Sequence, residues 1–186
     1  MKRKISTLLC IALSLMSLGA NAIAKGKAAV EPWKDPDVNE INRLPMTTTF
    51  EADGLKLSLS GLWKFNFNQD PNTRPADFYK GDYDDSQWGT MPVPGLWDMN
   101  GYCDPLYVNV QYPWNGHFPY TPPIVPDEHN YVGQYRHGFF ISDEWKGQDI
   151  VLHIGSATSN VRVWINGKEV GYSEDSKLEA RFDITK

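Results

Sequence analysis

The sequence of 186 residues has few cysteines, an excess of acidic over basic residues and no apolar run long enough to span a membrane. Its two cysteines are Cys10 and Cys103. The first lies in a predicted leader, so no internal disulfide is expected in the mature chain. The net charge of −5 argues against nucleic acid and against an anionic membrane surface as partners. Without a disulfide, the domain must be held together by its apolar core.

Residues 1–24 have the layout of a secretory signal peptide. A basic start at positions 2–4 is followed by an apolar stretch of 14 residues, 5–18, and then by small residues that fit a cleavage site. The stretch is shorter than the roughly 20 residues of a lasting membrane span. Cleavage would remove three positive charges and take the net charge from −5 to −8. We expect a periplasmic or secreted protein with no stable membrane insertion.

The rest of the sequence favours an all-β fold. Residues 25–46 are expected to be irregular, and no window beyond them has a convincing helical period. Alternating or compact apolar runs predict strands over 62–67, 132–141, 149–154 and 180–184. Two more runs flank Asn166-Gly167, a dipeptide typical of a two-residue hairpin turn. With 13 prolines and 15 glycines between such short strands, the pattern predicts a β-sandwich or jelly roll.

Known catalytic and metal-binding patterns are absent from the sequence. The four histidines show no metal-ligand spacing: His117, His129, His137 and His153. Asp84-Asp85 and Glu174-Asp175 are adjacent pairs, and neighbouring strand residues point to opposite faces. Neither pair is therefore expected to flank one glycosidic bond, as sugar hydrolysis requires. We predict no catalytic residue, metal site or cofactor in this chain.

Residues 101–131 form a long connection rich in aromatic rings and amides, and long connections in compact domains are usually functional. Flat rings and directed amides suit a carbohydrate site. The alternative is that many of these rings pack the connection onto the sandwich. The aromatic rings in this connection and just before it are Trp97, Tyr102, Tyr107, Tyr112, Trp114, Phe118 and Tyr120, and the amides between them are Asn100, Asn109, Gln111 and Asn115.

Several motifs, taken in order, resemble the β-galactosidase branch of glycoside hydrolase family 2. The resemblance covers nearly all of residues 31–186, and Gly171-Tyr172-Ser173-Glu174-Asp175-Ser176 resembles this branch rather than its glucuronidase-like relatives. The motifs are Asp37–Arg43, Pro94-Gly95-Leu96-Trp97, Gly101-Tyr102, Pro105, Tyr107–Pro113, Gly133-Gln134-Tyr135-Arg136, Ser142-Asp143-Glu144-Trp145, Val163–Tyr172 and Asp175–Thr185.

The resemblance implies a jelly-roll sugar-binding domain over residues 47–186, incomplete because a return strand would follow Thr185. It implies that Asn109 reaches into a galactose site and that Val110 lines the same site, with a β-galactoside or another small carbohydrate as partner. It places the catalytic glutamates, and the ligands of magnesium and sodium, in a later barrel domain outside this chain. Homo-oligomers would be expected only of the full-length enzyme.

Two functions follow from the sequence. In the first, the chain is the N-terminal part of a retaining β-galactosidase. In the second, it is a stand-alone secreted module that binds carbohydrate or another protein. The DNA downstream discriminates between the two, because only the first requires the reading frame to continue into a barrel.

Overall fold

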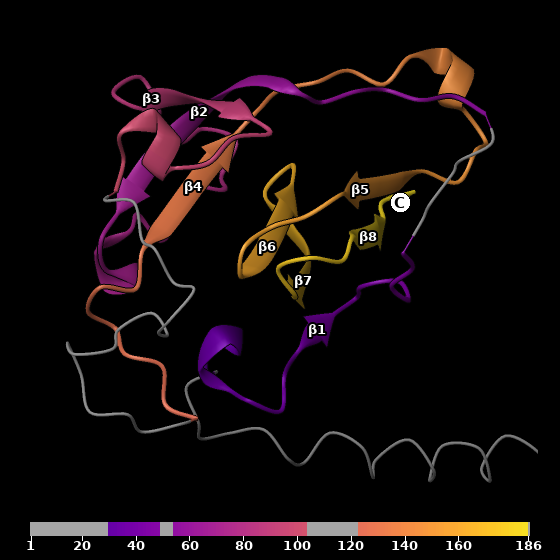
Figure 1. Ribbon diagram of the computed structural model, residues 1–186. Helices are drawn as coiled ribbons and strands as arrows, with labels where there is room; N and C mark the ends of the chain where they lie inside the picture. The colour runs from indigo at the N-terminus through magenta and orange to yellow at the C-terminus, as the bar shows by residue number, and fades with distance from the viewer. Residues whose placement is uncertain (1–29, 49–53, 104–122, 186) are drawn as a thin grey trace, which may run out of the picture. The chain divides into compact units, whose positions relative to one another are not determined.

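Short antiparallel strands and single-turn 3-10 helices, joined by irregular connections, are the regular elements of the described part of the chain (Figure 1). The structure is a computed structural model that describes residues 30–48, 54–103 and 123–185. The chain divides into two units, residues 1–31 and 32–186, and the strands described here belong to the second. The predicted all-β fold is confirmed. Among the described residues, no helix has the length and apolarity needed to span a bilayer.

The strands form three antiparallel sheets within the described residues, with the orders β1-β7-β6, β3-β2-β4 and β5-β8. The strands are β1 (Glu40–Ile41), β2 (Gly61–Asn68), β3 (Gly89–Val93), β4 (Val132–Arg136), β5 (Val151–Ile154), β6 (Asn160–Ile165), β7 (Lys168–Glu174) and β8 (Ala180–Asp183). The 3-10 helices are η1 (Pro32–Lys34), η2 (Pro71–Thr73), η3 (Asp98–Asn100) and η4 (Asp143–Trp145).

The hairpin predicted at Asn166-Gly167 joins β6 to β7. Both turn residues have positive φ, 51° at Asn166 and 79° at Gly167, as a two-residue hairpin turn requires. The register runs from Ile165↔Lys168 to Asn160↔Glu174, with one irregularity between Val163 and Trp164. The predicted strands at 62–67, 149–154 and 180–184 also appear, as β2, β5 and β8.

Three elements differ from the sequence expectation. The segment expected to be irregular, 25–46, contains η1 and the two-residue strand β1. β3 was not expected because Pro92 interrupts it, yet β3 lies at the edge of its sheet, where a missing N–H is tolerated. The strand expected over 132–141 ends at Arg136, and Phe140 beyond it is 96% exposed.

Buried apolar side chains lie in both larger sheets. Phe65 of β2 and Met91 of β3 are buried in one of them, and Tyr172 of β7 is buried in the other; Phe182 of β8, in the two-stranded sheet, is also buried. Gly171 lets β7 and β8 approach, because a Cβ there would lie 2.7 Å from the Phe182 ring. The site described next is built on the β3-β2-β4 sheet.

Candidate functional site

The two residues that the sequence assigns to sugar binding, Asn109 and Val110, lie outside the described residues. Segment 104–122, which contains them, is bounded by Cys103 on one side and Pro123 on the other. The candidate site is therefore built from the residues that lead into this segment and away from it. Both flanks contact the same strand, β2.

One face of β2 is a row of aromatic rings. Side chains alternate along a strand, so Trp63, Phe65 and Phe67 share a face. Phe65 pairs across the sheet with Tyr135 of β4, with ring centroids 4.7 Å apart. The rings that pack on this face define the aromatic cluster: Phe65, Phe67, Trp97, Tyr102, Tyr131 and Tyr135.

Trp97 fixes the first flank to the cluster. Its ring lies 5.5 Å from that of Phe67, and its Nε1–H donates to the hydroxyl of Tyr135 at 2.6 Å. The ring also covers Gly133 so closely that a Cβ at this glycine would come within 2.5 Å of it. Burial raises the pKa of the Tyr135 phenol, although the bond from Trp97 lowers it in part. The phenol therefore keeps its proton at neutral pH, and its oxygen accepts the bond from Trp97.

The turn after Trp97 sets where the chain enters segment 104–122. Gly101 closes η3 in the left-handed conformation, with φ 79°, which glycine adopts without strain. Tyr102 then turns back toward β3. Its ring packs edge-on against Phe65 with centroids 4.5 Å apart, and its hydroxyl donates to the carbonyl of Thr90 at 3.1 Å.

The second flank reaches the same strand through Tyr131, whose ring packs against Phe67 at 5.3 Å. Between Pro123 and this ring, Asp127 forms an ion pair of 2.6 Å with Lys34 of η1. The hydrogen bond from Lys34 is the main reason that the pKa of Asp127 lies below its usual range. The described residues on both sides of segment 104–122 thus pack on described elements, and Trp97 and Tyr131 both contact the ring of Phe67.

The opposite face of β2 is polar and already occupied. Gln134 is 2% exposed; its Oε1 accepts from Asn66 at 2.9 Å and Asn68 at 3.2 Å. Its Nε2 donates to the carbonyl of Pro75 at 2.9 Å. The bond to Pro75 holds the segment that joins β2 to β3, residues 69–88. The hydrogen-bonding groups of these amides are therefore used within the protein and not by a ligand.

Arg136 completes that polar face. Its Nε donates to Asp85 Oδ2 at 2.8 Å, and its Nη1 donates to the carbonyls of Lys80, at 3.0 Å, and Phe78. Asp85 is half-buried in this ion pair. Its neighbour Asp84 does cap a turn, by accepting from the amide of Ser86 at 2.9 Å.

The second pair of adjacent carboxylates is also divided between two structural contacts. Glu174 accepts from the hydroxyl of Tyr172 at 2.6 Å, and burial raises the pKa of that phenol, so it keeps its proton. Asp175 accepts from the amides of Lys177 and Leu178 at 2.6 and 2.8 Å. In the described part of the chain, no group of three or more histidine, cysteine or acidic side chains could hold a metal ion.

The structure divides the aromatic residues noted in the sequence. Trp97 and Tyr102 pack the connection onto the sheet, which is the alternative that the sequence left open. The five rings from Tyr107 to Tyr120 lie outside the described residues. Sequence reasoning missed the parts played by Phe67 and Tyr131, although the alternation of large rings over 63–67 was the available signal.

Comparison with known proteins adds the last observation. Residues 56–186 match the family model described as "Glycosyl hydrolases family 2, sugar binding domain". The chain is similar to a β-galactosidase of Halalkalibacterium halodurans, 38% identical over 164 residues that cover 82% of this chain and 16% of that protein. A β-galactosidase of Priestia megaterium is 41% identical over 128 residues, with 69% and 12% covered. A β-galactosidase large subunit of Leuconostoc lactis is 35% identical over 173 residues, with 81% and 28% covered. The chain thus spans 12–28% of the length of these three relatives.

Proposed function

Because the chain belongs to the sugar-binding domain family of the family 2 glycosyl hydrolases, we propose that it acts as the sugar-binding domain of a β-galactosidase and helps to bind a β-galactoside. The observation that carries the proposal is the family match, which runs from residue 56 to residue 186 and so includes β2 to β8. The relatives named above as β-galactosidases support galactosides as the substrate class.

In this proposal Asn109 donates to or accepts from a galactose hydroxyl, and Val110 lines the same site. The aromatic cluster supports the assignment because Trp97 and Tyr131, on the two sides of segment 104–122, pack against one ring, Phe67. A segment attached at both flanks loses less conformational freedom when it binds a ligand, which favours affinity.

Cleavage of the glycosidic bond belongs, in this proposal, to residues outside the chain. A retaining hydrolase needs two carboxyl groups roughly 5–5.5 Å apart, one as acid and one as nucleophile. Glu174 and Asp175, like Asp84 and Asp85, are engaged with separate structural partners. The catalytic glutamates, and magnesium and sodium with their ligands, would lie in a barrel domain elsewhere in the enzyme. Export through residues 1–24 and assembly of the whole enzyme into homo-oligomers complete the proposal.

The first test is the DNA downstream of the codon for Lys186. A reading frame that continues into a barrel supports the hydrolase. A stop codon at that point instead favours the stand-alone module, whose binding to galactose-containing sugars can be measured by calorimetry on the chain itself.

The second test is the variant Asn109→Ala in the complete hydrolase. One lost hydrogen bond of about 0.5–1.5 kcal/mol corresponds to a rise in KM of roughly two- to tenfold, with the melting temperature nearly unchanged. Asn160→Ala is the matched control, because Asn160 is an exposed amide at the start of β6. A large fall in melting temperature with unaltered kinetics would show that Asn109 is structural and not a sugar ligand.

A further inference from the structure

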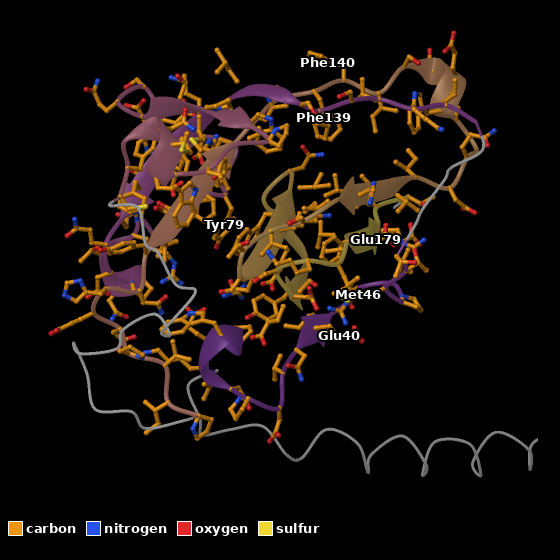
Figure 2. All side chains as sticks on the ribbon, in the orientation of Figure 1. Glu40, Met46, Tyr79, Phe139, Phe140 and Glu179 are labelled. Carbon is orange, nitrogen blue, oxygen red and sulfur yellow. The ribbon has the colours of Figure 1, made fainter. Side chains whose placement is uncertain are left out.

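Glu179, between β7 and β8, is a buried carboxylate that receives donors from three separate segments. Its side chain is 7% exposed. Oε1 accepts from the hydroxyl of Thr47 at 2.6 Å and from the Thr47 amide at 3.3 Å, and it forms an ion pair with Arg181 Nε at 2.8 Å. Oε2 faces His153 Nε2 of β5 at 2.8 Å. Figure 2 shows Glu179 beside Met46, on the segment that contributes Thr47.

That segment, residues 39–47, is here called the lead-in strand after β1 (Glu40–Ile41), the two of its residues that form a β-strand, and it borders both β7 and β8. Its N-terminal half pairs with β7 through Glu40↔Ser173. Farther along, the amide of Leu44 donates to the carbonyl of Arg181 at 2.8 Å. Arg181 also donates from Nη2 to the carbonyl of Pro45 at 2.6 Å. One guanidinium therefore contacts both the lead-in strand and Glu179, so the carboxylate orients the group that holds Pro45.

The charge on Glu179 is favoured where it stands. Burial would raise the pKa of this carboxyl, but the bond from Thr47 and the charges of Arg181 and His153 outweigh it and hold the pKa below its ordinary value of 4.5. A carboxyl with a lowered pKa in the folded state contributes stability above its unfolded pKa. That contribution is lost as the pH falls through the folded value.

The other nearby charges are directed elsewhere. Arg43 of the lead-in strand forms an ion pair with Glu40 at 2.5 Å. On the linker that carries Glu179, Asp175 is bonded to backbone amides, including that of Lys177, and the side chain of Lys177 is exposed. Protonation of Glu179 therefore acts directly on its contacts with His153, Arg181 and Thr47.

We propose that Glu179 is an acid-sensitive latch, which fastens the lead-in strand to β8 when it is ionised and releases residues 44–47 when it is protonated. Protonation removes the ion pair with Arg181 and turns one carboxylate oxygen into a donor. The result is that Arg181 loses the partner that aims it at Pro45.

The test is hydrogen exchange of individual amides in the full chain, expressed as protection factors at several pH values from 7 to 3. In the wild type, protection of the Leu44 amide should fall as the pH drops below the ordinary range of a carboxyl. In Glu179→Gln, it should already be about tenfold or more lower at pH 7, the size expected for lost bonds to a charged group. It should then change little with pH. The control Glu169→Gln removes an exposed carboxylate of the β6–β7 hairpin and should leave Leu44 unaffected.

Thr47→Val provides a second variant that keeps Glu179 and its charge. It removes only the hydroxyl donor, so Leu44 should lose protection at pH 7 while its pH dependence persists. This variant and the wild-type profile decide the matter even if Glu179→Gln fails to fold. The latch is refuted if Leu44 protection is flat with pH in the wild type. It is equally refuted if Glu179→Gln keeps both the wild-type protection and its pH dependence.

Discussion

Aromatic rings hold the sheet of β2, β3 and β4 to its flanking segments, whereas hydrogen bonds and ion pairs hold the lead-in strand to β7 and β8. In the first region Phe65 touches rings from β4 and from the turn after β3. In the second, the contacts converge on Arg181 and Glu179. Apolar packing does not titrate, so the contacts among the rings of the aromatic cluster should be insensitive to pH. The lead-in strand should respond to it.

The largest expected effect is that of Phe65→Ala. Phe65 is 1% exposed, and its removal leaves a cavity beneath Trp97 and Tyr102. The free energy of unfolding should fall by about 3–5 kcal/mol, measured by urea denaturation, and by the same amount at pH 7 and pH 5. Leu62→Ala on the same strand is the control, because Leu62 is 68% exposed and should change stability by roughly 0.5 kcal/mol or less. Equal effects of the two variants would show that the rings do not form a core.

The next effect concerns the close approach of β1, β7 and β8. A Cβ at Gly171 would lie 2.3 Å from the carbonyl oxygen of Ile41 and 2.7 Å from the ring of Phe182. Because a backbone atom cannot swing aside, Gly171→Ala should cost about 2–3 kcal/mol and should also lower the protection of the lead-in strand. Gly155→Ala, with nothing within 4 Å of the added methyl group, is the matched control. A neutral Gly171→Ala would show that β1 is not closely packed against β7.

Tyr135→Phe should have a moderate effect in the aromatic region. It removes the acceptor of the Trp97 indole bond and should cost about 1 kcal/mol, with no change between pH 5 and pH 8. Tyr102→Phe removes a hydroxyl bonded to the exposed carbonyl of Thr90 and should cost less, because water can replace that bond. In the hydrolase proposed above, Tyr135→Phe should raise KM more than Tyr102→Phe does. The reverse order would show that the Trp97 bond does not position the first flank.

The fold was predictable where the pattern is local. Alternation over 62–67 and the Asn166-Gly167 dipeptide were enough to predict β2 and the β6–β7 hairpin. β3 was missed because Pro92 breaks the pattern, and β4 was expected to be too long because its apolar character continues past Arg136.

The long-range polar contacts could not be predicted from local pattern. Thr47 and Glu179 are separated by 132 positions, and neither residue type signals such a partner. β1 is two residues long and exists because β7 lies beside it. For the site, the sequence placed Trp97 and Tyr102 among the rings of a candidate carbohydrate site, and the structure shows that they pack on β2. The roles of Asn109 and Val110 stay predictions.

The smallest expected effect tests whether an exposed ion pair behaves differently from the buried one at Glu179. Arg162 and Glu169 meet through two bonds of 3.0 and 2.8 Å beside the β6–β7 turn, with side chains 30% and 35% exposed. A double-mutant cycle between Arg162→Ala and Glu169→Ala should give a coupling energy of about 0.5 kcal/mol, the usual size for an exposed pair. The coupling should shrink in 1 M salt, where screening acts over roughly 3 Å. The bonds of Glu179 should persist in that salt, because burial protects them from screening. A coupling energy above about 1.5 kcal/mol that does not change with salt would show that the exposed pair is as strong as the buried one. The pH response assigned to Glu179 would then be expected at the hairpin as well.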